Sequence, residues 1–189
     1  VQSLLKKAAA LDIKTIAPLH GPVLKENLGY YIDLYNTWSS YGVESEGVLV
    51  AFASIHGNTR KAAEKIASIL EKQGAKKVVV SDLSRDDEAE VIEDAFRYGK
   101  MIIAAPTYDG GLFPPMESFL SHLKSKNYQK RTVGIIENGT WAPMSGKLMK
   151  AALESMKEIK ICDTVVTIKS ALKAEQEDSL VALAKEVLA

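Results

Sequence analysis

From Gly47 onward, the sequence repeats one unit five times: an apolar run of strand length, followed by a segment with helical spacing. The expected strands span residues 48–53, 77–80, 101–105, 132–136 and 161–168. In most of these runs the apolar residues are consecutive, which is typical of strands that are buried on both faces. The sequence therefore predicts an α/β fold in which helices cover both faces of a parallel sheet.

The order of these strands follows from the rules for crossover connections. Parallel strands are joined by right-handed crossovers, so few topologies remain. Five strands with five helices fit a doubly wound, five-stranded parallel sheet in the order 2-1-3-4-5. A ligand of such a sheet binds at the carboxyl ends of the strands, near the first and the third. We therefore expect the functional loops to follow strands one, three and four.

The composition excludes several classes of function. Among the 189 residues, 24 Lys and Arg balance 24 Asp and Glu, which argues against a general nucleic-acid binder. The longest strongly apolar run, residues 48–55, is too short to span a membrane. Cys162 is the only cysteine, so a disulfide within the chain is impossible and a reducing compartment, the cytoplasm, is expected. The three histidines are too few for a zinc or iron site built on a histidine cluster.

Residues 1–46 lie outside the repeat and are predicted to form an N-terminal helical and linker extension to the main domain, residues 47–189. Helical spacing indicates one helix near the start, and residues 13–16 are expected to form a short strand. Large side chains at intervals of 3–4 residues from Leu28 to Trp38 indicate one apolar helix face. The extension has too few apolar partners to form its own core. We therefore expect this face to pack on the main domain, on another chain, or on further sequence.

The loop after strand one reads Ser-Ile-His-Gly-Asn-Thr and has the chemistry of an anion site. The helix that follows supplies free N–H groups and a partial positive charge, while Ser54, Asn58 and Thr59 add polar side chains. Gly57 allows close approach of the backbone, and His56 is expected to contribute through its N–H. The loop contains no lysine, so it would bind a phosphate monoester through hydrogen bonds. A plain strand–helix turn with Asn58 or Thr59 as the N-cap is an equally weighted alternative.

Two further loops carry aromatic residues and glycines. The loop after strand three reads Pro-Thr-Tyr-Asp-Gly-Gly, and its adjacent glycines predict a mobile backbone that can present N–H and C=O groups to a flat ligand. The loop after strand four reads Asn-Gly-Thr-Trp, and Trp141 offers a ring for stacking. A simple turn and a lid residue are the respective alternatives. Together, the three loops describe a ligand with a phosphate tail and a planar head, which fits flavin mononucleotide (FMN) better than a sugar phosphate.

These loop sequences together resemble the flavodoxin domain of flavodiiron proteins. Residues 17–22, Ala-Pro-Leu-His-Gly-Pro, are similar to the segment that closes the β-lactamase-like di-iron domain of that family, in which the histidine is the last iron ligand. The helix that follows resembles the connector into the flavodoxin domain. The resemblance covers essentially the whole chain. It implies a carboxy-terminal part of such a protein, with residues 1–46 as the end of the di-iron domain plus linker and residues 47–189 as a flavodoxin-like FMN-binding domain.

The resemblance implies an FMN-binding electron-transfer module rather than a complete enzyme. It would pass electrons from a redox partner, such as a rubredoxin-like donor, toward a di-iron site in a parent protein; a homodimer is a further expectation. The rest of the di-iron domain is absent from the sequence. His20 would therefore ligate iron only in a full-length parent, and the chain alone is not expected to reduce oxygen or nitric oxide. The residues that the resemblance assigns to FMN are Ser54, His56, Gly57, Asn58 and Thr59 at the phosphate, Pro106, Thr107, Tyr108, Asp109, Gly110 and Gly111 at the ring, and Asn138, Gly139, Thr140 and Trp141 on its other side.

Three other functions remain open at this stage. A flavodoxin-like NAD(P)H or quinone reductase would need a substrate pocket over the ring. A receiver-type signalling domain has the same topology but needs a carboxylate at the end of strand one, where this chain has Ser54. A domain that has lost its flavin would serve only as an interaction surface.

Overall fold

The computed structural model describes residues 1–189, which divide into two compact units, Val1–Glu44 and Ser45–Ala189. The larger unit contains every buried residue of the chain. No helix is long and apolar enough to cross a membrane.

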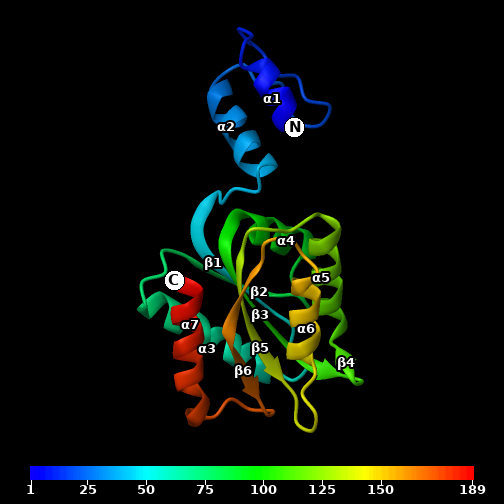
Figure 1. The fold of residues 1–189 in the computed structure, drawn as a ribbon, viewed down its shortest axis with the longest axis vertical. Helices are drawn as coiled ribbons and strands as arrows, with labels where there is room; N and C mark the ends of the chain where they lie inside the picture. Colours follow the sequence, from blue (N-terminus) through cyan, green and yellow to red (C-terminus); the bar gives the residue numbers. More distant parts are fainter. The chain divides into compact units, whose positions relative to one another are not determined.

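A parallel sheet forms the centre of the larger unit (Figure 1). Its long strands are β1 (Ser45–Phe52), β2 (Val78–Asp82), β3 (Tyr98–Tyr108), β5 (Thr132–Asn138) and β6 (Lys160–Ile168). They lie in the order β2-β1-β3-β5-β6, and every neighbouring pair is parallel. The predicted doubly wound order is thereby confirmed.

The sheet has one strand more than the five predicted. The two-residue strand β4 (Gly111–Leu112) pairs antiparallel with the end of β3, where Thr107 faces Leu112 and Tyr108 faces Gly111. The loop after β3 is therefore a β-hairpin. An Asp-Gly pair between strand-forming residues is a strong local hairpin signal, and the sequence analysis overlooked it.

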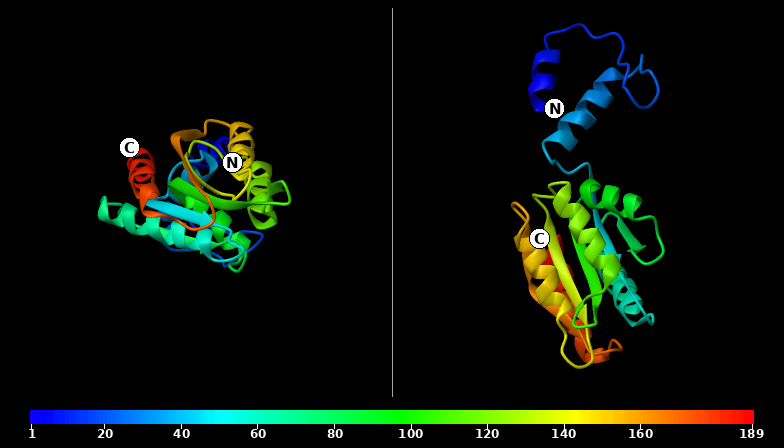
Figure 2. Two further views of the ribbon diagram at one scale, coloured as in Figure 1. Left: turned by 90° about the horizontal axis from the view of Figure 1, so that it is seen from below. Right: turned by 90° about the vertical axis from the view of Figure 1, so that its right-hand side faces the viewer.

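Five helices cover the two faces of the sheet (Figures 1 and 2). On one face, α3 (Asn58–Lys72) and α7 (Glu177–Leu188) pack together, and a short 3₁₀ helix, Ala174–Gln176, precedes α7. On the other face lie α4 (Glu88–Arg97), α5 (Pro114–Ser125) and α6 (Ser145–Glu154). The layered architecture predicted from the consecutive apolar runs is confirmed.

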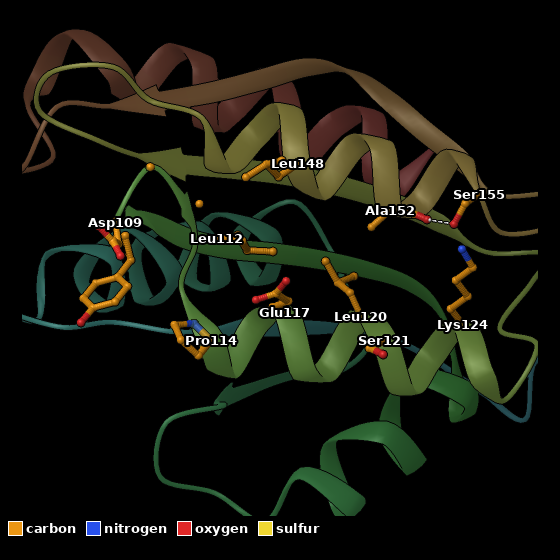
Figure 3. Close-up of a pocket in the computed structure, with 13 residues that line it drawn as sticks. Asp109, Leu112, Pro114, Glu117, Leu120, Ser121, Lys124, Leu148, Ala152 and Ser155 are labelled. Atoms are coloured by element: carbon orange, nitrogen blue, oxygen red, sulfur yellow. Dashed lines mark hydrogen bonds between the residues drawn. The ribbon is translucent and has the colours of Figure 1, made fainter.

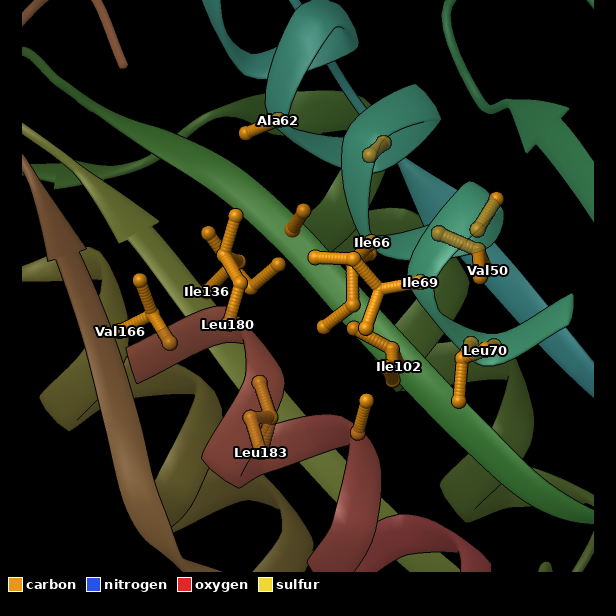
Figure 4. Close-up of a cluster of buried hydrophobic side chains, with 14 of the residues drawn as sticks. Val50, Ala62, Ile66, Ile69, Leu70, Ile102, Ile136, Val166, Leu180 and Leu183 are labelled. Carbon is orange, nitrogen blue, oxygen red and sulfur yellow. The ribbon is translucent and has the colours of Figure 1, made fainter. Parts of the chain in front are cut away.

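Alternation along the central strands produces two hydrophobic cores. In β1, Val48 and Val50 point to the α3–α7 side, whereas Leu49 and Ala51 point to the opposite side. Figure 4 shows the first core, in which α3 and α7 pack on one face of the sheet. Its members include Ile66 and Leu70 of α3, Leu180 and Leu183 of α7, and Ile102 and Ile136 of the sheet. Both cores end at the carboxyl edge of the sheet, so the loops at this edge stand on rigid strands.

The smaller unit contains two helices, α1 (Gln2–Ala8) and α2 (Leu28–Ser39). The strand expected at residues 13–16 is wrong, because only an isolated bridge between Ile16 and Leu24 is present there. None of the residues in this unit is buried. The aromatic side chains of α2 stay about half exposed, as at Tyr35 and Trp38. This agrees with the expectation that residues 1–46 cannot build a core of their own.

Candidate functional site

The loops that follow β1, β3, β5 and β6 meet at the carboxyl edge of the sheet and are tied together by hydrogen bonds. Three of them are the predicted loops. The fourth, residues 169–172, was missed, although the loop after the last strand of a parallel sheet also lies at this edge. The three predicted loops therefore do share one edge of the sheet, and a fourth loop joins them there.

The first loop ends in an open helix N-terminus. The N-cap of α3 is Gly57, with φ 83°, rather than Asn58 or Thr59 as expected, and no side chain caps the helix. The first backbone bond of this helix runs from the Lys61 N–H to the Gly57 carbonyl at 3.1 Å. The N–H groups of residues 58–60 have no acceptor within the chain. They carry the positive end of the helix dipole and are suited to bind an anion.

The space around this helix end is also open. A Cβ atom built on Gly57 would have no heavy atom within 4 Å, so the space beside the N-cap is open. The Ser54 hydroxyl accepts a hydrogen bond from the Gly57 N–H at 3.1 Å and fixes the shape of the loop. His56 is exposed, and its imidazole makes no hydrogen bond within the chain. The open donors of this loop are therefore mainly backbone groups.

Asn58 and Thr59 are already held by other loops. The Asn58 amide donates to the Ser170 hydroxyl at 3.2 Å. Thr59 is buried, and its hydroxyl oxygen lies 3.4 Å from the amide nitrogen of Asn138, which donates to it. Their side chains thus connect α3 to the loops after β5 and β6, while their N–H groups stay at the helix end.

The second loop is the two-residue turn of the β3–β4 hairpin. Asp109 has φ 49° and Gly110 has φ 69°, and positive φ at both central positions is typical of a type I′ turn. Gly110 and the Asp109 side chain are exposed at the tip, and Tyr108 is 50% exposed. The hairpin therefore presents a fixed set of backbone groups and one aromatic ring at the rim of the crevice.

Thr107 joins the second loop to the third. Its hydroxyl oxygen accepts hydrogen bonds from the N–H groups of Met144 at 2.8 Å and Ser145 at 3.1 Å. The buried Ser145 hydroxyl returns to the sheet and donates to the Ala105 carbonyl at 2.9 Å. Pro106 is half-buried between these contacts, in register with the end of β5. The N-terminus of α6 is therefore closed by the chain itself.

Glu137 completes the closure of α6. One carboxylate oxygen accepts from the Gly146 N–H at 2.9 Å, and the other accepts from the Thr167 hydroxyl at 2.7 Å. A negative charge at this position interacts favourably with the positive end of the helix dipole and so stabilises the helix. A Cβ atom at Gly146 would lie 2.7 Å from the Glu137 carboxylate, so only glycine fits there.

Asn138 links the third loop to the fourth loop by two hydrogen bonds. Its amide nitrogen donates to the Ser170 carbonyl at 2.9 Å, and its amide oxygen accepts from the Ser170 N–H at 3.0 Å. Ser170 adopts φ 69°, which this pair of bonds holds in place. The sequence analysis placed Asn138 at the ligand, whereas the structure uses most of its hydrogen-bonding capacity within the protein.

The rest of the third loop projects outward. Gly139 is required by packing, because a Cβ atom there would lie 2.8 Å from the Pro143 backbone. Thr140 and Trp141 are exposed, and the Trp141 ring is 97% accessible to solvent. The ring is available for stacking, but no protein contact fixes its orientation.

The two arginines near the first loop, Arg60 and Arg85, are already paired with Asp82. Arg60 of α3 forms an ion pair of 2.5 Å with Asp82, whose carboxylate is buried at the end of β2. The Asp82 carboxylate also forms an ion pair with Arg85, at 3.5 Å. The first loop itself contributes no cation, so neutral donors and the helix dipole supply the attraction for an anion.

No group of three or more His, Cys, Asp or Glu residues is placed to hold a metal ion. His20 lies exposed in the smaller unit. Cys162 is buried, as expected for a small apolar side chain, and burial raises the pKa of its thiol to about 11. A thiolate is therefore disfavoured at this position.

The chain matches a family model described as flavodoxin domain over residues 49–174. Among curated proteins, coenzyme F420H(2) oxidase of Methanothermobacter marburgensis is 30% identical over 118 residues, which are 62% of this chain and 28% of that protein. The anaerobic nitric oxide reductase flavorubredoxin of Escherichia coli is 21% identical over 156 residues, which are 79% of this chain and 32% of that protein. The chain thus spans about a third of the length of these relatives.

Solved structures show the same fold. The rubredoxin oxygen:oxidoreductase from Desulfovibrio gigas has a TM-score of 0.90 at 17% identity and matches 98% of this chain and 47% of its own. The flavodiiron protein from Giardia intestinalis has a TM-score of 0.86 at 19% identity, over 99% of this chain and 47% of its own. Flavodoxin 1 from Bacillus cereus has a TM-score of 0.64 at 18% identity, over 75% of this chain and 97% of its own.

Proposed function

The chain belongs to the flavodoxin domain family, and from this membership we propose that it binds FMN at the carboxyl edge of its sheet and acts as an electron-transfer module. One observation carries the proposal: the N-terminus of α3 is left open at the point where the loops converge. A phosphate monoester supplies the acceptors that the N–H groups of residues 58–60 lack.

The residues at this edge offer hydrogen-bond donors and open space that suit the phosphate of FMN. The phosphate oxygens would accept hydrogen bonds from the N–H groups of Asn58, Thr59 and Arg60. The open space beside Gly57 leaves room for the phosphate. A neutral donor set of this kind binds a phosphate through charge-assisted hydrogen bonds, without an ion pair. Ser54 would hold the loop in the shape that aims these groups.

The hairpin and the third loop would hold the isoalloxazine ring. Asp109–Gly110 presents backbone groups in a fixed geometry to the polar rim of the ring. Tyr108 and Trp141 are exposed aromatic rings on two different loops, and both can stack on a flat surface. The bonds from Met144 and Ser145 to Thr107 would keep these loops at a constant separation.

The bound flavin would supply the redox chemistry, accepting and donating electrons. This chain's own residues would bind and orient it and limit the access of water to one face. In this role, no side chain at this edge is needed to transfer a proton.

We further propose that Val1–Glu44 is the end of a di-iron domain plus linker and that His20 is an iron ligand in a longer parent protein. The matches to the Desulfovibrio and Giardia structures extend over nearly the whole chain, whereas the match to the Bacillus flavodoxin covers 75% of it. The electron donor would be a rubredoxin-like protein, as the names of two relatives suggest. Cytoplasmic location and a homodimer remain parts of this proposal.

A visible spectrum of the purified full chain, before and after addition of FMN, tests the proposal. We expect one FMN per chain, with a structured flavin absorption band and quenched flavin fluorescence. Bound flavin should be reduced by a rubredoxin-type donor and not by NADPH alone. Failure to bind added FMN would overturn the proposal in favour of an interaction domain, and rapid bleaching by NADPH alone would favour the reductase.

A further inference from the structure

A groove of about 680 Å³ runs between α5 and α6, starting at the β3–β4 hairpin (Figure 3). At the hairpin it touches Tyr108, Asp109, Gly110 and Gly111, but most of its wall comes from the two helices. None of residues 54–59 or 138–141 lines it. The groove is therefore distinct from the open end of α3, although residues 108–111 at its hairpin end also belong to the proposed ring-binding set.

The groove exists because small residues line it where the two helices face each other. On α5, Glu117, Leu120, Ser121 and Lys124 follow the spacing of one helix face. On α6 and just beyond it, Leu148, Ala152 and Ser155 do the same. Ser121, Ala152 and Ser155 are too short to bridge the space between the helices, as Figure 3 shows.

The groove combines an apolar wall with charged ends. The apolar lining comes from the partly exposed Leu112, Leu148 and Ala152 and from Pro114, whereas Leu120 is nearly buried at its floor. A volume of several hundred Å³ with apolar walls and a few polar groups is typical of a small-molecule site. Helix geometry places Glu117 and Lys124 about 10 Å apart along α5, at different positions along the length of the groove.

The two ends differ in sign. Asp109 and Glu117 lie toward the hairpin, whereas Lys124 and Ser155 lie at the far end. A smaller cavity of about 250 Å³ shares Lys124 and Ser155 with the groove and adds Lys157. The Lys124 ammonium and the Glu117 carboxylate are exposed and form no ion pair within the chain, so both charges are available to a ligand.

We propose that this groove is a second binding site, for a small amphipathic anion. The flat apolar body of the ligand lies against Leu112 and Leu148, and its carboxylate or sulfonate group pairs with Lys124. Asp109 and Glu117 repel an acidic group at the hairpin end, so the charges of the chain orient the ligand in one direction. The proposal does not depend on flavin binding.

Anilinonaphthalene sulfonate, a flat aromatic anion, is a suitable probe for the full chain, and phenylnaphthylamine has the same body without the charge. We expect the anion to bind with a fluorescence increase and to shift the backbone amide signals of Ser121 and Ala152 in NMR spectra. Lys124→Glu should weaken binding of the anion about tenfold and leave the neutral analogue unchanged. Lys126→Glu, at the end of the same helix but outside the groove, is the matched control and should bind both probes like the wild type.

Filling the groove gives an independent test. Ala152→Phe and, from the facing helix, Ser121→Phe should each abolish binding of both probes, whereas Ala151→Phe on the exposed side of α6 should not. All these variants should bind FMN like the wild type, which separates this site from the proposed flavin site. The inference is overturned if the control variants lose as much affinity, if the amide shifts appear at Tyr30 and Trp38 instead, or if FMN displaces the probe and the groove variants lose FMN.

Discussion

Two helix N-termini at the same edge of the sheet are treated in opposite ways. At α6, Thr107 and Glu137 accept hydrogen bonds from the N–H groups of the N-cap and the first two helical residues, Met144, Ser145 and Gly146. At α3, Gly57 stands at the N-cap, and the first N–H groups of the helix have no acceptor. An N-terminus with an unpaired set of donors is less stable than a capped one by about 1 kcal/mol. Under the proposal above, the closed end of α6 serves the fold and the open end of α3 binds the phosphate.

Other N–H groups of the domain support this contrast. Asp87 caps α4 by accepting from the Ala89 N–H at 2.9 Å. In β6, the register shift opposite Gly134 exposes the Thr164 N–H, and the Glu186 carboxylate accepts from it at 3.0 Å. The chain thus supplies side-chain acceptors for N–H groups at several places, in contrast to the open end of α3.

The largest expected effect lies at the closed end. Thr107→Val keeps the shape of the side chain but removes the acceptor of two N–H groups, so the free energy of unfolding should fall by about 2 kcal/mol. Urea unfolding of the flavin-free protein measures it. Thr140→Val, on the exposed part of the third loop, is the matched control and should change stability by less than about 0.5 kcal/mol. Equal losses in both variants would contradict the closure of α6 by Thr107.

A charge at the open end should have two opposite effects. Asn58→Asp places a carboxylate in the first turn of α3, which should stabilise the flavin-free protein by about 0.5 kcal/mol through the helix dipole. The same charge repels a phosphate, so FMN affinity should fall about tenfold. Asn127→Asp adds the same charge in a distant exposed turn and should leave FMN affinity unchanged. Unaltered FMN binding by Asn58→Asp would show that the phosphate lies elsewhere.

A smaller, pH-dependent effect is expected at Glu186. Its hydrogen bonds from the Thr164 side chain and N–H hold the pKa of this carboxyl below the usual 4.5. A carboxyl whose pKa is lowered by folding stabilises the protein above its unfolded pKa, and this contribution disappears as the pH falls through the folded pKa. Glu186→Gln should therefore cost about 0.5 kcal/mol at neutral pH, a small value because the group is exposed to solvent, and nothing in strong acid. Glu154→Gln, an exposed position on α6, should show no such pH dependence.

The smallest effect is expected for a buried hydroxyl that has no function in this account. Tyr128 is fully buried, and its hydroxyl has no hydrogen-bond partner; burial raises the pKa of the phenol. Removing an unpaired buried polar group should be neutral or slightly stabilising, so Tyr128→Phe should change the unfolding free energy by less than about 0.5 kcal/mol. A clear loss in urea unfolding would mean that the hydroxyl has a partner that the structure does not show.

The fold was predictable because its signal is repeated along the chain. Consecutive apolar runs such as the one from Val48 indicate buried parallel strands, and the crossover rules then order them. The hairpin was missed because Asp109–Gly110 was considered as ligand-binding backbone rather than as turn chemistry. The short strand at residues 13–16 failed because the segment has almost nothing to pack on, and a strand needs a neighbouring strand and a core.

The site was predictable by location and less so by role. Topology places the loops at one edge, and this holds for all fifteen residues assigned to FMN. The sequence could not show that Asn138 and Thr59 serve as links between loops, because their partners, such as Ser170, are distant in the chain. It also could not show that Gly57, rather than a polar residue, occupies the N-cap of α3.

The most direct test of the open α3 N-terminus is the affinity of the full chain for FMN compared with riboflavin, measured by quenching of flavin fluorescence. Riboflavin has the same ring and lacks the phosphate. If the unpaired N–H groups of α3 bind the phosphate, FMN should bind at least about a hundredfold more tightly, since several charge-assisted hydrogen bonds are lost with riboflavin. Equal affinities for the two flavins would contradict the account.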